Sequence, residues 1–471
     1  MNLLTCQLIT YSHPSTFIPI KNPVFTEARR TWKLSLPLIL AELSQVGLGL
    51  IDTAMVGAIS YRQLAAAALV NSVINIPFVL GVGLALSISQ NVSMAHGRRD
   101  APLVSHYFYN GFWLCAFTAL LIAAGLHVGS GIVFHLGQDA EVAALARPYL
   151  KVIGWSLVPM LLFMAMRQFT DGLEHTRIGM VLSIAALPAN AFLNWLFIYG
   201  KWGLPRLELY GAGIATLLTR LLMFLAIAAL VLGQKRFRRY RQVSRRQWKL
   251  KKETWRSLLR IGIPSSLQIG MESGAFAVSG ILIGTIGALE QAAHQIALSF
   301  AAFTFMVSMG LSQGGAIRAS NAWGRNDWNA IRLIGKGNLI SALAYGTFCA
   351  TGFILFRNYL PAFFTNDAPV MALAAYLLLF AGFFQISDAT QSVAVGLLRG
   401  VKDVKVPTLY VAMAYWLIGI PTGCLMAFYF KMGAAGMWIG FVAGLTFSSL
   451  LLNRRFGRLV RRKQPDKPML P

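Results

Sequence analysis

The residues best placed to do chemistry in this sequence are acidic side chains inside long apolar segments. Four of the seventeen acidic residues fall there: Glu42, Asp52, Glu272 and Asp388. A carboxylate at mid-depth in a bilayer costs at least ~2.5–3.5 kcal/mol, and intramembrane acids are by default assigned to ion or substrate sites. We therefore predict functional roles for Asp52, Glu272 and Asp388. Glu42 lies near the start of its segment, and an interfacial position explains it equally well.

Oxygen-bearing side chains accompany Asp52 in the first half of the chain. Gln45 lies seven residues before Asp52 and therefore on the same helical face. Asn190 and Asn194 are i,i+4 neighbours in a later apolar segment, and Thr216 lies in the next one. A carboxylate, two amides and a hydroxyl are hard oxygen donors, suited to Na⁺ or to a proton relay.

The second half offers a comparable set. Gln268 and Glu272 lie on a polar stripe of one apolar segment, and such a stripe is expected to face a cavity. Asp388 lies in another segment, in the phrase FFQISDATQS. We predict that Glu272 and Asp388 form the cation site of this half. Arg220, in the middle of the sixth segment, must pair with an acid or face water, and the sequence does not place it.

The elements that position these residues are membrane-spanning helices. Of the 471 residues, 56% are hydrophobic and only 13% are charged, against about 25% charged in an ordinary soluble domain. The apolar residues come in blocks of the length that an α-helix needs to cross a bilayer. The twelve predicted spans are 34–58, 66–94, 107–128, 148–169, 178–199, 211–233, 258–287, 293–316, 337–358, 371–396, 407–430 and 434–453.

Charge and cysteine content exclude several other classes. The net charge of +25 comes mainly from residues between apolar blocks, notably at 235–256 and 454–463, and indicates topology rather than nucleic-acid binding. The positive-inside rule predicts a multi-pass protein of a bacterial-type inner membrane with both termini in the cytoplasm. The four cysteines have no close pair, which excludes a disulfide scaffold and a zinc knuckle. The N-terminus has no features of a removable signal peptide.

The two halves of the chain are copies of each other. A shift of 227 residues aligns 37–100 with 264–327 without a gap, ending on Ala-x-Gly-Arg-x-Asp in both copies. Since the copies start on the same side, the repeat is parallel, an architecture found in transporters. We predict an all-α membrane protein of two six-helix bundles. The predicted units are an N-terminal segment 1–33, an N-lobe 34–233, a basic linker 234–257, a C-lobe 258–453 and a basic tail 454–471.

These features resemble the multidrug and toxic compound extrusion (MATE) family, and most closely its NorM-like branch. The resemblance covers essentially all of residues 30–455. The phrases that carry it include IDTAMVG (51–57), PANAFLNWLFIYGKWGLP (188–205), PSSLQIGMESGAF (264–276) and DATQSVAVGLLRGVKD (388–403). The family implies the MATE fold and the export of organic cations and amphipathic drugs in exchange for Na⁺ or H⁺.

The resemblance also implies site roles. Glu272 and Asp388 correspond to the second-lobe cation pair, and Asp52, Asn190, Asn194 and Thr216 to the first-lobe site, where the first three would hold Na⁺ in a Na⁺-coupled protein. Where NorM-like members can have an ion-site tyrosine, four residues before the tenth-span acid, this chain has Phe384. The predicted substrate contacts are Gln45, Gln268, Glu272, Gln295, Phe384 and Asp388.

The functional prediction is thus a monomeric secondary transporter with no cofactor besides the coupling ion. Its partners are a cationic or amphipathic small molecule and membrane lipid, and no nucleic acid. No nucleotide-binding loop, HExxH or GxSxG motif is present, so an enzyme is disfavoured. The nearest alternative is a flippase for a lipid-linked saccharide, which needs cations to hold pyrophosphate, whereas Arg220 is the only buried cation expected here. A cation channel is a further alternative.

Overall fold

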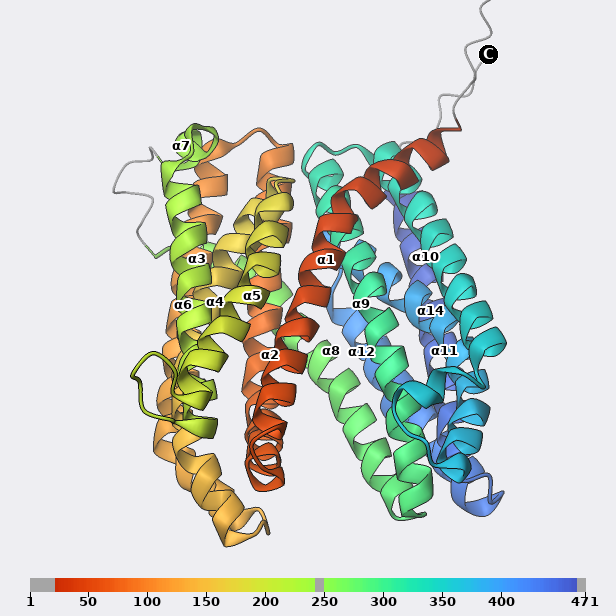
Figure 1. Ribbon diagram of the computed structural model, residues 1–471. Helices are drawn as coiled ribbons and strands as arrows, with labels where there is room; N and C mark the ends of the chain where they lie inside the picture. Colours follow the sequence, from red (N-terminus) through yellow and green to blue (C-terminus); the bar gives the residue numbers. More distant parts are fainter. Residues whose placement is uncertain (1–21, 242–249, 464–471) are drawn as a thin grey trace, which may run out of the picture.

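The computed structural model describes residues 22–241 and 250–463. These residues form helices and connecting turns, with no strands. Twelve helical stretches of the described chain are long and apolar enough to cross a membrane, which confirms the predicted number of spans. They are arranged in two bundles, which confirms the predicted all-α fold (Figure 1).

The first bundle contains six long helices. They are α1 (Pro23–Gly57), α2 (Tyr61–Gly97), α3 (Ala101–Val128), α4 (Ala140–Gly172), α5 (Arg177–Tyr199) and α6 (Glu208–Gly233). The short helix α7 (Arg238–Arg241) follows. The second bundle contains α8 (Lys252–Gly284), α9 (Ala288–Gly324), α10 (Trp328–Phe356), α11 (Ala368–Gly400), the stretch from α12 (Lys405–Ala412) through α13 (Ile420–Cys424) to Tyr429, and α14 (Ala434–Lys463).

Most helices are longer than the apolar blocks that predicted them. α1 begins eleven residues before the predicted span, and α11 runs on to Gly400. Helical hydrogen bonding continues into polar sequence, whereas hydropathy stops at the hydrocarbon boundary. The eleventh span differs most, since two π-helical pieces (Met413–Gly419 and Leu425–Tyr429) flank α13. Pro421 lies between them, and a proline removes a helical hydrogen bond.

The repeat is visible in backbone detail. Asp100 and Asp327 cap the third helix of each copy, accepting a hydrogen bond at 2.9 Å from Leu103 N and Ala330 N respectively. Immediately before these caps, Arg99 and Asn326 have matching φ angles of 59° and 57°. The two copies of the sequence repeat therefore also share the backbone conformation of this turn.

The first helix of each copy crosses between the bundles. The start of α1 packs on α10, where Gly337 meets Val24, and its middle on α9, where Gly310 meets Ile39, while the later turn at Gly47 packs on Leu187 of α5. In the same way, Trp255 and Leu258 at the start of α8 join the hydrophobic core formed by α2, α3 and α4. The boundary between the lobes therefore runs within α1 and α8, rather than at the linker alone.

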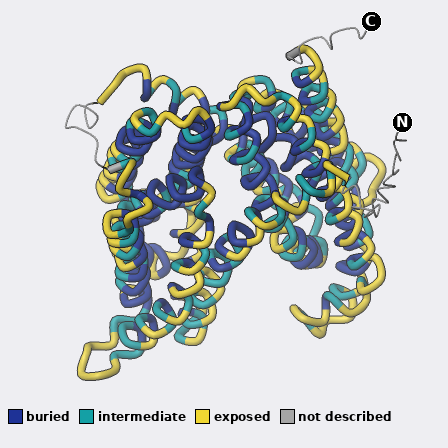
Figure 2. The backbone as a smooth tube through the Cα atoms, turned by 90° about the horizontal axis from the view of Figure 1, so that it is seen from above, coloured by how far each residue is buried: buried dark blue, intermediate teal, exposed yellow. Residues whose placement is uncertain are grey.

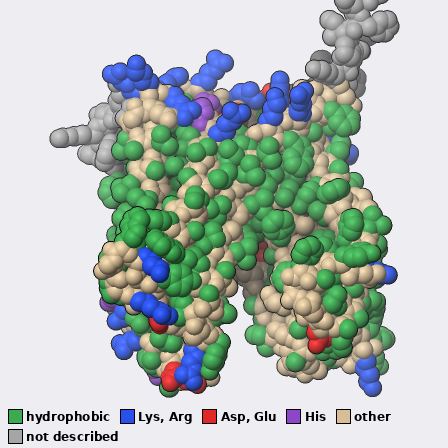
Figure 3. Space-filling model, in the orientation of Figure 1, with side chains coloured by type: hydrophobic (Ala, Val, Ile, Leu, Met, Phe, Trp, Pro, Cys, Tyr) green, Lys and Arg blue, Asp and Glu red, His purple; other side chains and the backbone are tan. Residues whose placement is uncertain are grey.

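The lobes are pressed together at one end of the molecule. This end, called here the basic face, contains the helix ends rich in Lys and Arg around Arg98 and Arg325 (Figure 3, top). There Ser93 Oγ of α2 donates to Ile317 O of α9 at 2.7 Å. A Cβ on Gly97 would lie 2.2 Å from Asn321 O, so glycine is required for this close approach. On the opposite side, the surface is hollowed between the lobes (Figure 3).

Buried residues concentrate inside each bundle (Figure 2). Many large apolar side chains on the outer helix faces are exposed, including Phe117, Leu121, Phe348 and Leu355. Since each bundle has its own packed interior, these outward side chains are free to contact lipid. The polar residues inside the bundles are consequently the ones that require a functional explanation.

Candidate functional site

The first candidate site is a polar cluster where α1, α5 and α6 meet. The Asp52 carboxylate accepts hydrogen bonds from Asn194 Nδ2 at 2.7 Å and from Thr216 Oγ1 at 3.2 Å. Asn194 Nδ2 also contacts Asn190 Oδ1 at 3.1 Å. The structure therefore brings together the four side chains that the sequence assigned to the first-lobe site.

One atom of this cluster lacks a partner. Asn190 and Asn194 are both buried, one helical turn apart on the same face of α5. Among the described residues, no group donates a hydrogen bond to the buried Asn194 Oδ1. Buried polar atoms are normally satisfied, so an unpaired oxygen beside a carboxylate suits a bound cation. The donor set therefore fits Na⁺, and the carboxylate fits a proton equally well.

A cavity of about 460 Å³ extends from this cluster into the space between the lobes. Asp52, Gln45 and Arg220 line it, together with Tyr149. Arg220 Nη1 donates to Ser156 Oγ at 2.6 Å, and its charge also interacts with Asp52. Arg220 thus lies on the wall of the same cavity as Asp52, in agreement with the expectation that it pairs with an acid or faces water.

Glu42 lies inside the protein rather than at the interface. Its Oε1 is 2.9 Å from Arg167 Nη2, and Arg167 Nε is 3.5 Å from Asp171 Oδ2. From the other lobe, Gln313 Nε2 of α9 reaches Glu42 Oε1 at 3.4 Å. These four residues form a buried polar network that links α1 and α4 to the second bundle.

The second candidate site lies between α8, α11 and the π-helical stretch after α12. Glu272 Oε1 accepts hydrogen bonds from Gln391 Nε2 at 2.9 Å and from Tyr415 OH at 3.3 Å. Asp388 is 2% exposed, and its Oδ2 has no hydrogen-bond partner among the described residues. Both predicted carboxylates line one site. Within it, Glu272 accepts two hydrogen bonds, whereas Asp388 Oδ2 accepts none from the described residues.

A second cavity, of about 380 Å³, opens beside these carboxylates. Glu272, Asp388 and Gln268 line it with the aromatic rings of Phe276 and Phe384. The centroids of these two rings are 6.0 Å apart in an edge arrangement. Acid and aromatic faces together bind flat organic cations by charge and cation–π attraction.

The two cavities adjoin. Their linings share five residues from both lobes: Leu86, Ile269, Ser273, Met309 and Gln313. A molecule in the hollow between the lobes would therefore contact either carboxylate group from one central space.

One sequence prediction about this region is corrected, and one predicted substrate contact lies outside both cavities. Arg399 lines the second cavity and is only 7% exposed, because α11 continues to Gly400. Arg167 lines the first cavity. The prediction that Arg220 is the only buried cation was therefore wrong, since the apolar pattern ends before Arg399 while the helix does not. Gln295 is exposed on α9 and lines neither cavity, so it does not join the predicted substrate contacts.

Sequence reasoning also missed two tyrosines. Tyr149 lines the first cavity, and the Tyr415 hydroxyl binds Glu272. Both lie in apolar helices where a phenol counts as hydrophobic, so hydropathy gave no signal. A buried tyrosine hydroxyl usually has a polar partner, which is the rule that would have marked them.

Comparison with known sequences identifies the relatives of this chain. A family model described as MatE matches residues 37–196 and 264–425. The "probable multidrug resistance protein NorM" of Rhizobium meliloti is 36% identical over 93% of this chain and 94% of its own length. The "multidrug resistance protein MdtK" of Edwardsiella ictaluri is 32% identical over 92% of this chain and 96% of its own.

Solved structures share the fold at low sequence identity. A MOP superfamily transporter from Pyrococcus furiosus superposes with a TM-score of 0.86 at 18% identity, covering 93% of this chain and 97% of its own. The eukaryotic MATE transporter AtDTX14 superposes with a TM-score of 0.82 at 21% identity, covering 94% and 99%. Both bundles therefore have close counterparts in known transporter structures.

Proposed function

The chain belongs to the MATE family of membrane transporters, and from that premise we propose that it exports organic cations and amphipathic drugs in exchange for Na⁺ or H⁺. The proposal rests mainly on one observation, the unpaired Asp388 carboxylate oxygen in a cavity walled by aromatic rings. The family membership makes the protein a transporter rather than an enzyme. The relatives named as multidrug resistance proteins support the substrate class.

The coupling ion binds at Asp52 in this proposal. Asp52, Asn190, Asn194 and Thr216 supply hard oxygens at one point, including the unpaired Asn194 Oδ1. Entry of a cation or a proton neutralises Asp52 and changes its interaction with Arg220 across the cavity. The site is thus tied to a wall of the central space rather than isolated from it.

The transported cation binds in the second cavity. Asp388 and Glu272 supply negative charge, and Phe276 and Phe384 supply flat apolar surface. The ion also reaches these carboxylates, and its binding there competes with that of the drug. Two ligands that stabilise different states of one protein are coupled by linkage, without direct contact.

Alternating access follows from the arrangement of the lobes. The hollow between them opens opposite the basic face, where α2 and α9 are in contact. Separation of α2 and α9 would open the central space to the other side. The positive-inside rule puts the basic face in the cytoplasm of a bacterial-type inner membrane, with both termini there. The molecule described is then outward-facing, and one copy contains both sites, which favours a monomer.

Transport by proteoliposomes tests this function. Purified protein is reconstituted, ethidium is loaded, and a Na⁺ gradient and a pH gradient are imposed separately. We expect one gradient to drive ethidium movement, and Asp52→Asn and Asp388→Asn each to reduce it at least ~10-fold. Asp403→Asn, which removes an acid paired with Arg455 on the basic face, is the matched control. Movement of ethidium under neither gradient would contradict the proposal.

A flippase for a lipid-linked saccharide is the second candidate, favoured by the three arginines on the cavity walls. Arg167 and Arg220 balance Glu42 and Asp52 in the first cavity, and Arg399 accompanies Glu272 and Asp388 in the second. Guanidinium groups bind diphosphates well, but here carboxylates surround them. A flippase would translocate a fluorescent undecaprenyl-diphosphate analogue without an ion gradient, which the antiporter is not expected to do.

A further inference from the structure

Two cavities on the basic face, outside the central cleft, are not explained by the proposed transport function. The first, called here groove A, has a volume of about 980 Å³. It lies among the first turns of α1, the start of α5 and the last turns of α9. Six cations line it against one lining carboxylate, Glu174. The cations are Arg30, Lys33, Arg177, Arg236, Arg318 and Arg325.

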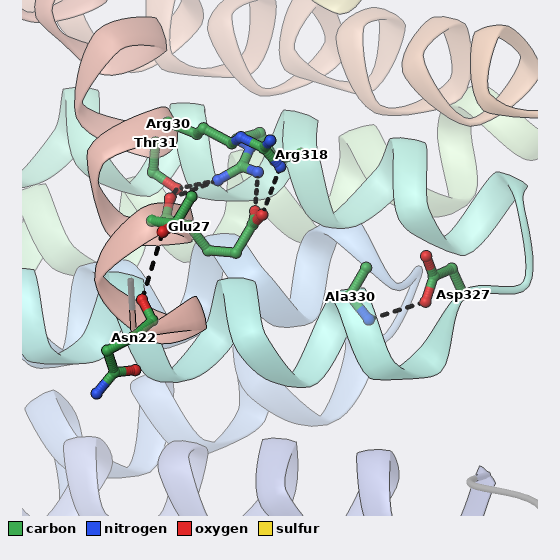
Figure 4. A network of polar contacts seen from close by, with 8 residues as sticks. Asn22, Glu27, Arg30, Thr31, Arg318, Asp327 and Ala330 are labelled. Atoms are coloured by element: carbon green, nitrogen blue, oxygen red, sulfur yellow. Dashed lines mark hydrogen bonds and ion pairs between the residues drawn. The ribbon is translucent and has the colours of Figure 1, made fainter. Parts of the chain in front are cut away.

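Two of these six are neutralised by one acid. Arg318 forms an ion pair with Glu27 of α1 and donates to Glu27 O and Thr31 Oγ1, each at 2.7 Å (Figure 4). Arg30 Nη1 lies 2.7 Å from the same carboxylate. By contrast, Lys33, Arg177 and Arg325 are exposed and make no ion pair with any described residue. Groove A thus keeps an excess of uncompensated positive charge.

Part of the lining of groove A is apolar. This part, called here the apolar wall, consists of Leu34, Ile178, Val181, Leu182 and Ile334. Val181 is 56% exposed, so part of this apolar wall is accessible to an acyl chain. A free anion would gain nothing from this apolar wall, whereas the acyl chains of a phospholipid would cover it.

The end of α5 in the groove is also suited to an anion. α5 begins at Arg177 with no acidic residue in its first turn and no side-chain cap. Thr176, which precedes it, donates instead to Leu34 O of α1 at 3.3 Å. A cation at a helix N-terminus opposes the helix dipole, so a bound phosphate would relieve both charges. Asp100 and Asp327 already supply such an anion to α3 and α10.

The internal repeat contains the same arrangement a second time. Groove B, of about 1170 Å³, lies at the start of α8 and beside the start of α12. Arg260, the counterpart of Lys33, and Lys405, the counterpart of Arg177 at a shift of 228 residues, line groove B together with the apolar Leu259 and Ile263. Arg98, the counterpart of Arg325, does not line groove B, but its charge acts on Lys402 there. Burial and the charges of Arg98 and Arg260 lower the pKa of Lys402 in groove B to about 8. Two cationic lining positions therefore recur in both grooves, although many other positions differ.

From these observations we propose that each groove binds the phosphate headgroup of an anionic phospholipid, with its acyl chains along the apolar wall. Anionic lipids populate the cytoplasmic leaflet, and basic pockets between membrane helices bind their headgroups. Groove A joins α1 to both lobes, so an occupied groove would hold the two lobes together at the basic face. This binding does not depend on the identity of the transported substrate.

The test measures lipid binding by the purified full chain in neutral detergent. Native mass spectrometry counts bound phosphatidylglycerol, with phosphatidylcholine and inorganic phosphate as separate arms. The groove variant is Lys33→Gln/Arg177→Gln/Arg325→Gln. The control is Arg332→Gln/Lys336→Gln/Arg458→Gln, which removes the same charge from exposed positions that line neither groove.

We expect phosphatidylglycerol to bind at least ~10-fold more tightly than phosphatidylcholine, since uncompensated cations attract an anionic headgroup. The groove variant should lose at least ~10-fold in affinity for one bound phosphatidylglycerol, the lipid of groove A, and should keep the lipid of groove B, whereas the control should lose less than ~2-fold at either. Equal loss in both variants, or equal binding of the two lipids, would overturn the proposal. Displacement of the lipid by inorganic phosphate at the same concentration would also overturn it, in favour of a free anion. Arg177→Gln alone, at an exposed position, repeats the test if the triple variant does not fold.

Discussion

The two lobes descend from one repeat but place their acids differently. In the aligned register, Asp52 corresponds to Ser279, and Glu272 corresponds to Gln45. The acid of α1 (Asp52) and the acid of α8 (Glu272) thus occupy positions seven residues, or two helical turns, apart on the same face of the first helix of their copies. In the N-lobe, both Asp52 oxygens accept hydrogen bonds, whereas in the C-lobe Asp388 Oδ2 has no described partner. The fold is therefore duplicated, but its chemistry is divided between the lobes.

The cations differ in the same way. Arg167 is held between two acids in the N-lobe, while Arg399 in the C-lobe makes no ion pair within the described chain. A carboxylate with satisfied oxygens suits a small ion that replaces one partner at a time. An unsatisfied carboxylate beside aromatic rings suits a larger cation. The predictions below test this difference, beginning with the largest expected effect.

Arg167→Gln should cause the largest loss. It leaves Glu42 and Asp171 buried without a counter-charge, which typically costs about 3–5 kcal/mol. Arg399→Gln should cost much less, because no described ion pair is broken. Thermal unfolding in detergent measures both. The triple variant Glu42→Gln/Arg167→Gln/Asp171→Asn removes all three charges and should recover most of the stability lost in Arg167→Gln. If it does not, the ion pairs of Arg167 with Glu42 and Asp171 are not the cause of the loss.

Asn194→Ala should weaken the binding of Na⁺ at the Asp52 site by ~10-fold or more. It removes Asn194 Oδ1, the unpaired oxygen that the proposal gives to the ion, while the Asp52 carboxylate stays in place. The measurement is the ion concentration that gives half-maximal ethidium transport. Gln391→Ala, which removes the corresponding donor to Glu272, should instead change the drug concentration at half-maximal rate. The same effect from both variants would remove the distinction between the lobes.

Phe384→Leu should lower the affinity for flat aromatic cations by ~5-fold. The change keeps an apolar side chain beside Asp388 but removes a ring that can contact the cation, an interaction of about 0.5–2 kcal/mol. Ethidium binding is measured by fluorescence. Phe117→Leu, at an exposed ring on the outer face of α3, serves as control. An unchanged ethidium affinity in Phe384→Leu would exclude this ring from the binding surface.

The smallest expected effect concerns pH and lies outside the membrane. The folded protein holds the pKa of Lys402 at about 8, below the ordinary value of 10.5. Between these values the unfolded chain binds more protons, so this residue makes stability rise with pH across that window. Lys402→Gln should therefore flatten the rise of Tm from pH 8 to 10.5 by a few degrees. Glu174→Gln, at the corresponding N-lobe position, should leave the slope unchanged.

The twelve spans and the two six-helix bundles could be predicted from sequence, because apolar blocks mark the spans and an ungapped repeat marks the two bundles. The Asp52 cluster could be predicted as well, since Asn190 and Asn194 share a helical face and few polar groups compete with them. Contacts between the lobes could not be predicted. Gln313 reaches Glu42 only because α1 crosses between bundles, and nothing in the local pattern of α1 indicates that crossing.

Helix ends and helix faces also limit what the sequence predicts. Arg399 was assigned to a loop because hydropathy falls before the helix does. Gln295 was predicted as a site residue from its type and span, but it is exposed and lines neither cavity. Sequence periodicity shows which residues share a helix face. It does not show which face borders a cavity when both lipid and the adjacent helices are apolar.

Equilibrium binding of tetraphenylphosphonium, with no gradient imposed, tests the division between the lobes most directly. Wild type, Asp52→Asn, Asp388→Asn and the control Asp403→Asn are compared at one pH and one Na⁺ concentration. The account predicts at least ~30-fold weaker binding for Asp388→Asn, and binding within ~3-fold of wild type for Asp52→Asn and Asp403→Asn. Equal losses in Asp52→Asn and Asp388→Asn, or full binding in Asp388→Asn, would contradict it.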